Sequence, residues 1–136
     1  MGIEWKEYLS SGIRWIDDQH KCFFKKIDIF LEDIQANKGS VESVTALKEV
    51  EDYVHFHFST EERYMLQYDY QNRKLHMSQH KIYRKKFEKL KTKYGIEEAS
   101  TDFLREFQLS IIDWYMNHIQ KHDKKLADYL SEKVDK

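Results

Sequence analysis

Hydrophobic residues recur every three or four positions along most of the chain, which is the spacing of one face of an α-helix. Segments with this period cover residues of about 17–37, 41–67, 72–93 and 99–131. Short polar breaks separate them at residues 37–40, 68–72 and 94–96. Four helices with short connections predict an all-α fold, specifically an antiparallel up-down-up-down four-helix bundle.

The first 16 residues lie outside this pattern but contain large apolar side chains. These are Trp5, Tyr8, Ile13 and Trp15. We expect residues 1–16 to form an ordered arm packed on the bundle. A chain of 136 residues is the size of one domain, so residues 1–136 are expected to form a single domain. Proline is absent and only 4 glycines occur, which is too few turn-forming residues for a β-rich domain.

The charge balance excludes several classes of partner. Lys and Arg total 23 and Asp and Glu total 24, so the net charge is -1 and favours neither nucleic acid nor a membrane surface as partner. No apolar run is long enough to span a membrane, and the polar N-terminus lacks a signal-peptide core. Cys22 is the single cysteine, which rules out an internal disulfide. We expect a cytoplasmic monomer.

Seven polar side chains occupy helix positions where apolar residues belong. They are His20, His57, Glu61, His76, His80, His118 and Asp123. One such histidine alone is usually a hydrogen-bonded core residue without further role. Seven unpaired buried polar groups would cost on the order of 7–20 kcal/mol, which is comparable with a domain's stability of about 5–15 kcal/mol. Coordination of a metal is the simplest compensation.

The spacing of these residues places several of them together on a helix face. His57 and Glu61 are four residues apart, as are His76 and His80, so each pair shares one face of its helix. Such a pair can chelate one metal ion or serve two neighbouring ions. His55 lies two residues from His57 and is expected to point to the surface.

The carboxylate of the last segment is less simple to assign. Asp123 follows His118 by five residues, which is about 140° around an ideal α-helix. His122 has the regular spacing of four and is the competing candidate. Asp123 continues the apolar face that carries Leu126 and Leu130, so we favour Asp123.

The predicted donors suit a pair of metal ions better than one. A tetrahedral zinc ion uses only four ligands, whereas imidazoles and carboxylates together suit iron and similar metals. The five imidazoles, four oxygens of bridging carboxylates and two contacts to an oxo or hydroxo bridge would fill all but one position of two octahedral ions. A dry bundle with one open position admits only a small ligand, and dioxygen fits.

The same donors bear on the type of chemistry. Di-iron oxidases of the four-carboxylate kind carry Glu-x-x-His motifs, and this sequence contains none. We hypothesise that oxygen chemistry here stops at reversible electron transfer. The protein is therefore expected not to be an enzyme.

Several motifs closely resemble those of the hemerythrin family, most of all its bacterial single-domain form. The resemblance spans nearly the whole chain. Its opening signature runs from Trp5 through Gly12-Ile13 to Asp17-x-Gln19-His20. The later motifs are His57-Phe58-x-x-Glu61-Glu62, His76-x-x-x-His80 and Trp114-x-x-x-His118-Ile119-x-x-x-Asp123. Their order and separations make the resemblance specific.

The resemblance implies two non-haem iron ions (Fe2+/Fe3+) with an oxo or hydroxo bridge, and reversible dioxygen binding for oxygen carriage, storage or delivery. By position, one iron would be held by His76, His80 and His118. The other would be held by His20 and His57 and would keep the open place. The bridging carboxylates would be Glu61 and Asp123.

One departure and several alternative functions stay open. Tyr115 stands where the family commonly has an aliphatic residue, and its phenol either hydrogen-bonds bound oxygen, admits water or only packs in the core. The alternatives to a carrier are an oxygen- or redox-sensing module, a di-iron peroxidase or NO-handling enzyme, and a zinc hydrolase built from His76, His80 and His118. The protein partner expected is an unidentified oxygen-consuming or electron-donor protein.

Overall fold

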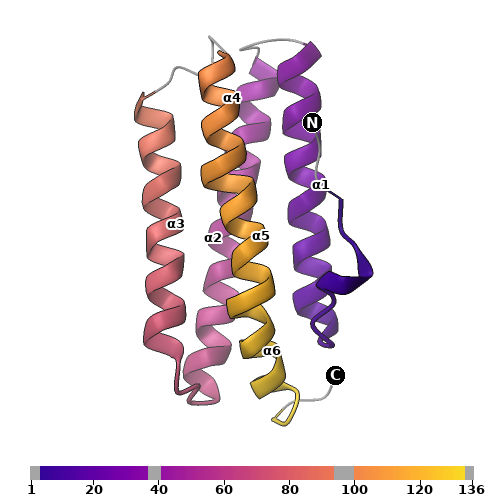
Figure 1. Cartoon of the computed structure of the whole chain (residues 1–136), viewed down its shortest axis with the longest axis vertical. Coiled ribbons are helices and arrows are strands. Elements are labelled where there is room, and N and C mark those ends of the chain that lie inside the picture. Colours follow the sequence, from indigo (N-terminus) through magenta and orange to yellow (C-terminus); the bar gives the residue numbers. More distant parts are fainter. Residues whose placement is uncertain (1–3, 37–40, 94–99, 134–136) are drawn as a thin grey trace.

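The computed structural model describes residues 4–36, 41–93 and 100–133. Three long helices come first, namely α1 (Arg14–Ala36), α2 (Val41–Gln67) and α3 (Arg73–Lys93). A fourth helix is continuous through α4 (Thr101–Phe107), η3 (Gln108–Asp113), α5 (Trp114–His118), η4 (Ile119–Asp123) and α6 (Lys124–Leu130). The four helices run side by side in alternating directions, and no strand occurs among the described residues (Figure 1). The predicted all-α four-helix bundle is confirmed.

The helix bounds follow the hydrophobic periodicity closely, with one clear difference. The second helix has the predicted limits, whereas α1 begins at Arg14, three residues before the expected start. The Ser11 hydroxyl accepts a hydrogen bond from the Ile13 amide, so the chain turns into the helix there rather than at Asp17. Gly12 has φ +88°, a conformation that favours glycine, and makes this early turn. The breaks expected at residues 37–40 and 94–96 lie outside the described residues.

The described part of the N-terminal arm, from residue 4 onward, lies along α1 (Figure 1). It contains a short 3-10 turn, η1 (Glu7–Leu9), whose Leu9 is buried in the core. The ammonium of Lys21 in α1 lies 4.3 Å from the centre of the Trp5 ring, and this cation–π interaction helps to hold the arm against the helix. Asp17 accepts hydrogen bonds from the Ser11 amide and the Ser10 hydroxyl, at 2.8 Å and 2.9 Å.

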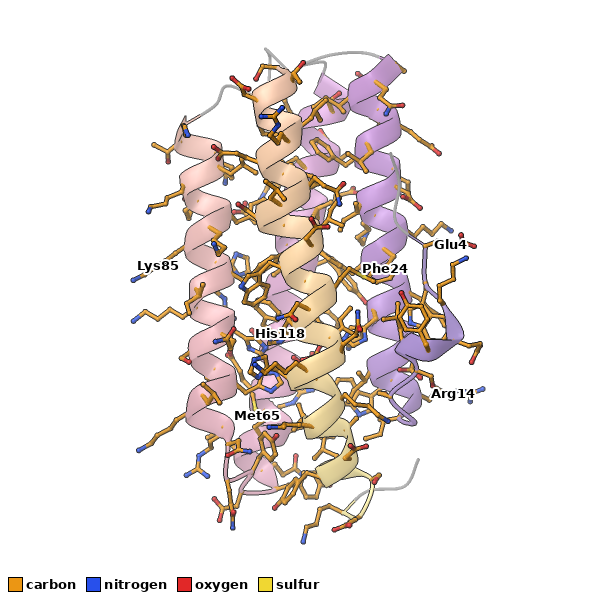
Figure 2. All side chains as sticks on the ribbon, in the orientation of Figure 1. Glu4, Arg14, Phe24, Met65, Lys85 and His118 are labelled. Atoms are coloured by element: carbon orange, nitrogen blue, oxygen red, sulfur yellow. The ribbon has the colours of Figure 1, made fainter. Side chains whose placement is uncertain are left out.

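The interior consists of two apolar clusters with a polar layer between them. The larger cluster includes Phe24 and Phe58, and the smaller one includes Ile16 and Met65. Figure 2 shows this order along the bundle, with Phe24 above His118 and Met65 below it. The apolar residues on both sides keep water from the polar layer. This raises the free-energy cost of any polar group inside the layer that lacks a hydrogen-bond partner.

The hydrophobic spacing of residues 41–67 predicts Val44 on the core face of α2, but the structure places it outside that face. Val44 is 40% exposed, whereas Ser43, Leu47 and Val50 are buried. The buried face follows the helical spacing from Ser43, and Val44 is about 100° further around the helix.

Within the described residues, we find no helix with the length and apolar content required to cross a bilayer.

Candidate metal centre

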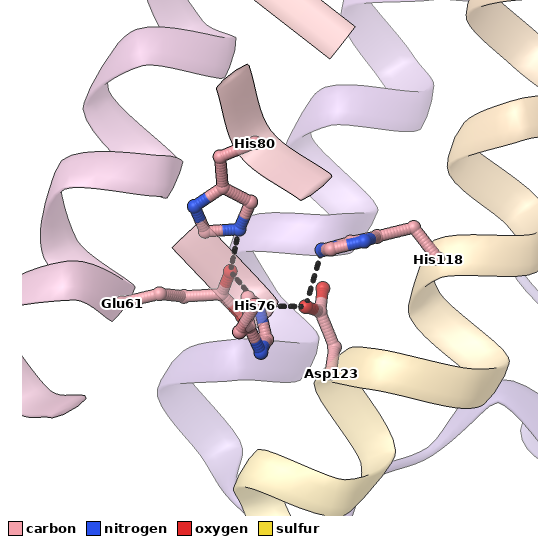
Figure 3. A group of neighbouring side chains, drawn as sticks. All are labelled: Glu61, His76, His80, His118 and Asp123. Atoms are coloured by element: carbon pink, nitrogen blue, oxygen red, sulfur yellow. Dashed lines mark hydrogen bonds and ion pairs between the residues drawn. The ribbon is translucent and has the colours of Figure 1, made fainter. Parts of the chain in front are cut away.

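The structure brings all seven polar residues singled out by the sequence into one buried cluster. They are His20, His57, Glu61, His76, His80, His118 and Asp123. Each of the four helices contributes at least one of them. His55, expected at the surface, is exposed. Figure 3 shows five of the cluster residues, with the histidine rings directed toward the two carboxylates.

The winding of the fourth helix explains how Asp123 reaches the cluster. The segment η4, between His118 and Asp123, is a π-helix, whose hydrogen bonds span five residues instead of four. Residues five apart therefore lie on one face, and His118 Nε2 lies 2.9 Å from Asp123 Oδ1. Asp123 is fully buried in the cluster, whereas His122 is only partly buried and belongs to neither group of candidate donors. π-helical turns often occur at functional sites.

The Asp123 carboxylate divides its two oxygens between two sets of imidazoles. Oδ1 lies 3.0 Å from His76 Nε2 and 2.9 Å from His118 Nε2. Oδ2 lies 2.8 Å from His20 Nε2 and 3.6 Å from His57 Nε2. One carboxylate thus faces four imidazoles, one from each of the four helices.

The Glu61 carboxylate is divided in the same way. Oε1 lies 3.1 Å from His80 Nε2 and 3.4 Å from His76 Nε2, while Oε2 lies 3.6 Å from His57 Nε2. The candidate donors therefore form two groups in which the ligand atoms lie within 4.8 Å of one another, and both carboxylates belong to both groups. The larger group, drawn in Figure 3, adds His76, His80 and His118. The smaller group adds His20 and His57.

Two further side chains orient the imidazoles from outside the cluster. His57 Nδ1 donates to Gln19 Oε1 at 2.6 Å, and His80 Nδ1 donates to Glu62 Oε2 at 2.8 Å. The guanidinium of Arg84 also approaches Glu62, at 3.4 Å. A proton held on Nδ1 leaves Nε2 as the free electron pair that points inward, which is the arrangement of metal-binding histidines. Sequence reasoning assigned no role to Gln19 or Glu62, although each directly neighbours a candidate ligand in the chain.

Burial and neighbouring charges shift the titration of the cluster. Burial raises the pKa of Glu61 to about 7, and the charge of Asp123 contributes. Burial lowers the pKa of His76, but the close carboxylates of Asp123 and Glu61 outweigh it and raise the value to about 10. Burial, with the charges of His76 and His118, holds the pKa of His80 well below its usual value. Burial raises the pKa of Asp123, but the charge of His118 and the hydrogen bond with His20 outweigh it and hold the value well below its usual one.

The cluster contains more buried polar atoms than it can pair internally. The inward atoms without a hydrogen-bond partner are Nε2 of His57, His76 and His118, Oε2 of Glu61 and Oδ1 of Asp123. Each such atom is costly to bury, and protonating the imidazoles to satisfy them would bring several positive charges close together. A metal cation accepts electron pairs from both kinds of atom at once. The residues present therefore fit a cation with nitrogen and oxygen ligands.

A match to the family model of the hemerythrin HHE cation binding domain extends over residues 11–130 and so includes the entire cluster. The chain belongs to the hemerythrin family. The resemblance seen in the sequence motifs is confirmed by this match. Hemerythrin domains bind non-haem iron, and the buried histidines and carboxylates of this chain could hold a metal.

Curated relatives of this hemerythrin carry the name bacteriohemerythrin. The one from Pseudomonas paraeruginosa is 28% identical over 126 residues, covering 93% of this chain and 80% of the relative. The one from Clostridium acetobutylicum is 26% identical over 128 residues, covering 91% and 98%. The one from Methylococcus capsulatus is 30% identical over 121 residues, covering 89% and 90%. The similarity thus extends over most of the length of each chain.

Proposed function

We propose that this hemerythrin binds dioxygen reversibly at a pair of non-haem iron ions and thereby carries, stores or delivers oxygen. The observation that carries the proposal is the division of the oxygens of Glu61 and Asp123 between two groups of imidazoles. Carboxylates that face two groups at once suit the role of bridges between two ions. Similarity to proteins named bacteriohemerythrin supports the same function.

The unequal size of the two groups supports an open position at one ion. His76, His80 and His118 would hold the first ion together with both carboxylates, which makes five protein donors. His20 and His57 would hold the second ion, where the same carboxylates bring the protein donors to four. When bound, the iron pair with its oxo or hydroxo bridge supplies the electrons for reversible dioxygen binding.

The surroundings of the smaller group favour a small apolar guest. Phe23, Phe58 and Tyr115 are fully buried, and Tyr115 lies beside the rings of His20 and His57. Such a wall excludes water and larger molecules from the ligand side of the site. The aromatic residues beside the proposed oxygen-binding position would therefore also keep water and larger reactants away from bound oxygen. This suits an oxygen carrier better than a catalyst.

The test is to load the metal-free protein with Fe2+ under nitrogen, then alternate air and argon while recording the absorption spectrum. We expect two irons per chain and a band that appears with air and disappears with argon over repeated cycles. His57→Ala should lose this band, whereas His55→Ala, an exposed histidine on the same helix, should keep it. Irreversible oxidation on the first exposure, turnover of peroxide or NO, or uptake of zinc instead of iron would contradict the proposal.

We expect iron binding to release protons, and the number to fall as pH rises. Ligands must lose their protons to bind a metal, and the pKa values of Glu61 and His76 are raised to about 7 and about 10. Near pH 6 both groups hold a proton and near pH 8.5 only His76 does, so these two groups should release about one proton more at pH 6 than at pH 8.5. Apparent iron affinity should accordingly increase with pH. Calorimetry in buffers of different ionisation enthalpy measures the number of protons released on iron binding. A number that is constant or increases with pH would contradict the prediction.

A further inference from the structure

The hydroxyl of Tyr115 is a buried polar group that the protein leaves without a partner. The side chain is fully buried, and its oxygen has no hydrogen-bond partner among the described residues. Tyr83 provides a direct comparison, because it is equally buried but its hydroxyl donates to the Ile111 carbonyl at 2.9 Å. A phenylalanine could provide the same ring for packing at position 115. The hydroxyl therefore needs an explanation other than packing.

The ring of Tyr115 lies beside the smaller group of candidate ligands. Its centroid is 5.9 Å from the His20 ring, perpendicular to it, and 6.3 Å from the His57 ring. Phe23 and Phe58 pack against the same ring at 4.2 Å and 6.4 Å. The ring of His118, in the larger group, is 6.4 Å away, so His20 of the smaller group is the candidate ligand whose ring lies nearest to Tyr115.

The Tyr115 hydroxyl is available as a hydrogen-bond donor. A neutral phenol offers one O–H donor. The cluster is rich in acceptors but the described residues leave this donor unused, so an acceptor from outside the protein can take it.

We propose that Tyr115 donates a hydrogen bond to the small ligand bound on the side of His20 and His57. The site would then select small ligands whose outer atom accepts a hydrogen bond, in particular small anions, over ligands of equal size that cannot. Tyr115 would be a specificity-determining residue, and this inference rests on the proposed iron pair. The bond would slow ligand release, because it must break before the ligand leaves.

The first test measures azide binding to the oxidised, iron-loaded full-length protein by absorption titration. Tyr115→Phe should raise the azide dissociation constant about tenfold, which equals about 1.4 kcal/mol and is near the lower limit for a hydrogen bond to a charged acceptor. Tyr83→Phe is the matched control and should change the constant by less than about twofold. Equal azide affinity in the wild type and Tyr115→Phe would overturn the inference while leaving the iron pair intact.

The second test uses the metal-free protein and does not depend on ligand binding. In denaturant unfolding, Tyr115→Phe should be at least as stable as the wild type, because no hydrogen bond is lost. Tyr83→Phe should be less stable, because its removal leaves the buried Ile111 carbonyl without this donor. Equal destabilisation by both variants would show that the Tyr115 hydroxyl has a structural partner and would overturn the inference. Failure of the wild type to take up iron would instead overturn the proposed function, and the inference with it.

Discussion

Asp123→Asn is expected to abolish assembly of the metal pair. Asp123 faces His76 and His118 with one oxygen and His20 and His57 with the other, so it is the residue on which both groups depend most. An amide keeps the shape but loses the charge and binds iron weakly. Loss of outer-shell partners alone costs about 10–100-fold in metal affinity, so loss of this bridge should cost more than about 100-fold. Iron content after desalting should fall below one per chain.

The matched control is Asp128→Asn in the same helix. Asp128 is exposed and forms a surface ion pair with Lys124 at 3.4 Å, an interaction that contributes little to stability. This variant should bind iron as the wild type does. Retention of two irons by Asp123→Asn would show that this carboxylate does not bridge them.

Removal of the metal is expected to lower the melting temperature substantially. The cluster gathers buried polar atoms that have no partner within the protein, and a metal bound only by the folded chain stabilises it by mass action. At a free metal concentration about 1,000 times the dissociation constant, the gain is about 4 kcal/mol. For a chain of this size that corresponds to a rise of roughly 10–20 °C in Tm. Thermal unfolding followed by circular dichroism, with and without chelator, measures this change in Tm.

The variant that cannot assemble the pair serves as the control for this effect. Asp123→Asn should melt at the same temperature with and without chelator, because it has little metal to lose. An iron-loaded wild-type protein whose Tm does not change on chelation would contradict the account, since the buried donors would then be satisfied in another way.

Helical periodicity was sufficient to predict the bundle, but not the details of its helix ends. The limits of α2 agree with the hydrophobic pattern, because that helix lies between clear polar breaks. The start of α1 differs, because Ser11 and Gly12 form a turn whose effect depends on backbone conformation rather than on hydrophobicity. Val44 was misplaced because one apolar residue beside the buried face satisfies the pattern almost as well as Ser43 within it.

The cluster could be predicted where regular helix geometry controls it. His57 with Glu61 and His76 with His80 follow the four-residue spacing, and the structure places each pair on one face. Asp123 could be favoured from its apolar neighbours and from the resemblance to the hemerythrin motif, since the π-helical segment that turns it inward leaves no simple spacing signal. Gln19 and Glu62 were missed because both are partly exposed, and their contacts depend on side-chain conformations that periodicity does not describe.

The most direct test of the central claim is a crystal structure of the iron-loaded protein with anomalous scattering recorded at the iron edge. We predict two iron peaks within the bundle. One should lie among His76, His80 and His118, the other beside His20 and His57, and both should contact Glu61 and Asp123. A single peak, or iron bound outside this cluster, would contradict the account.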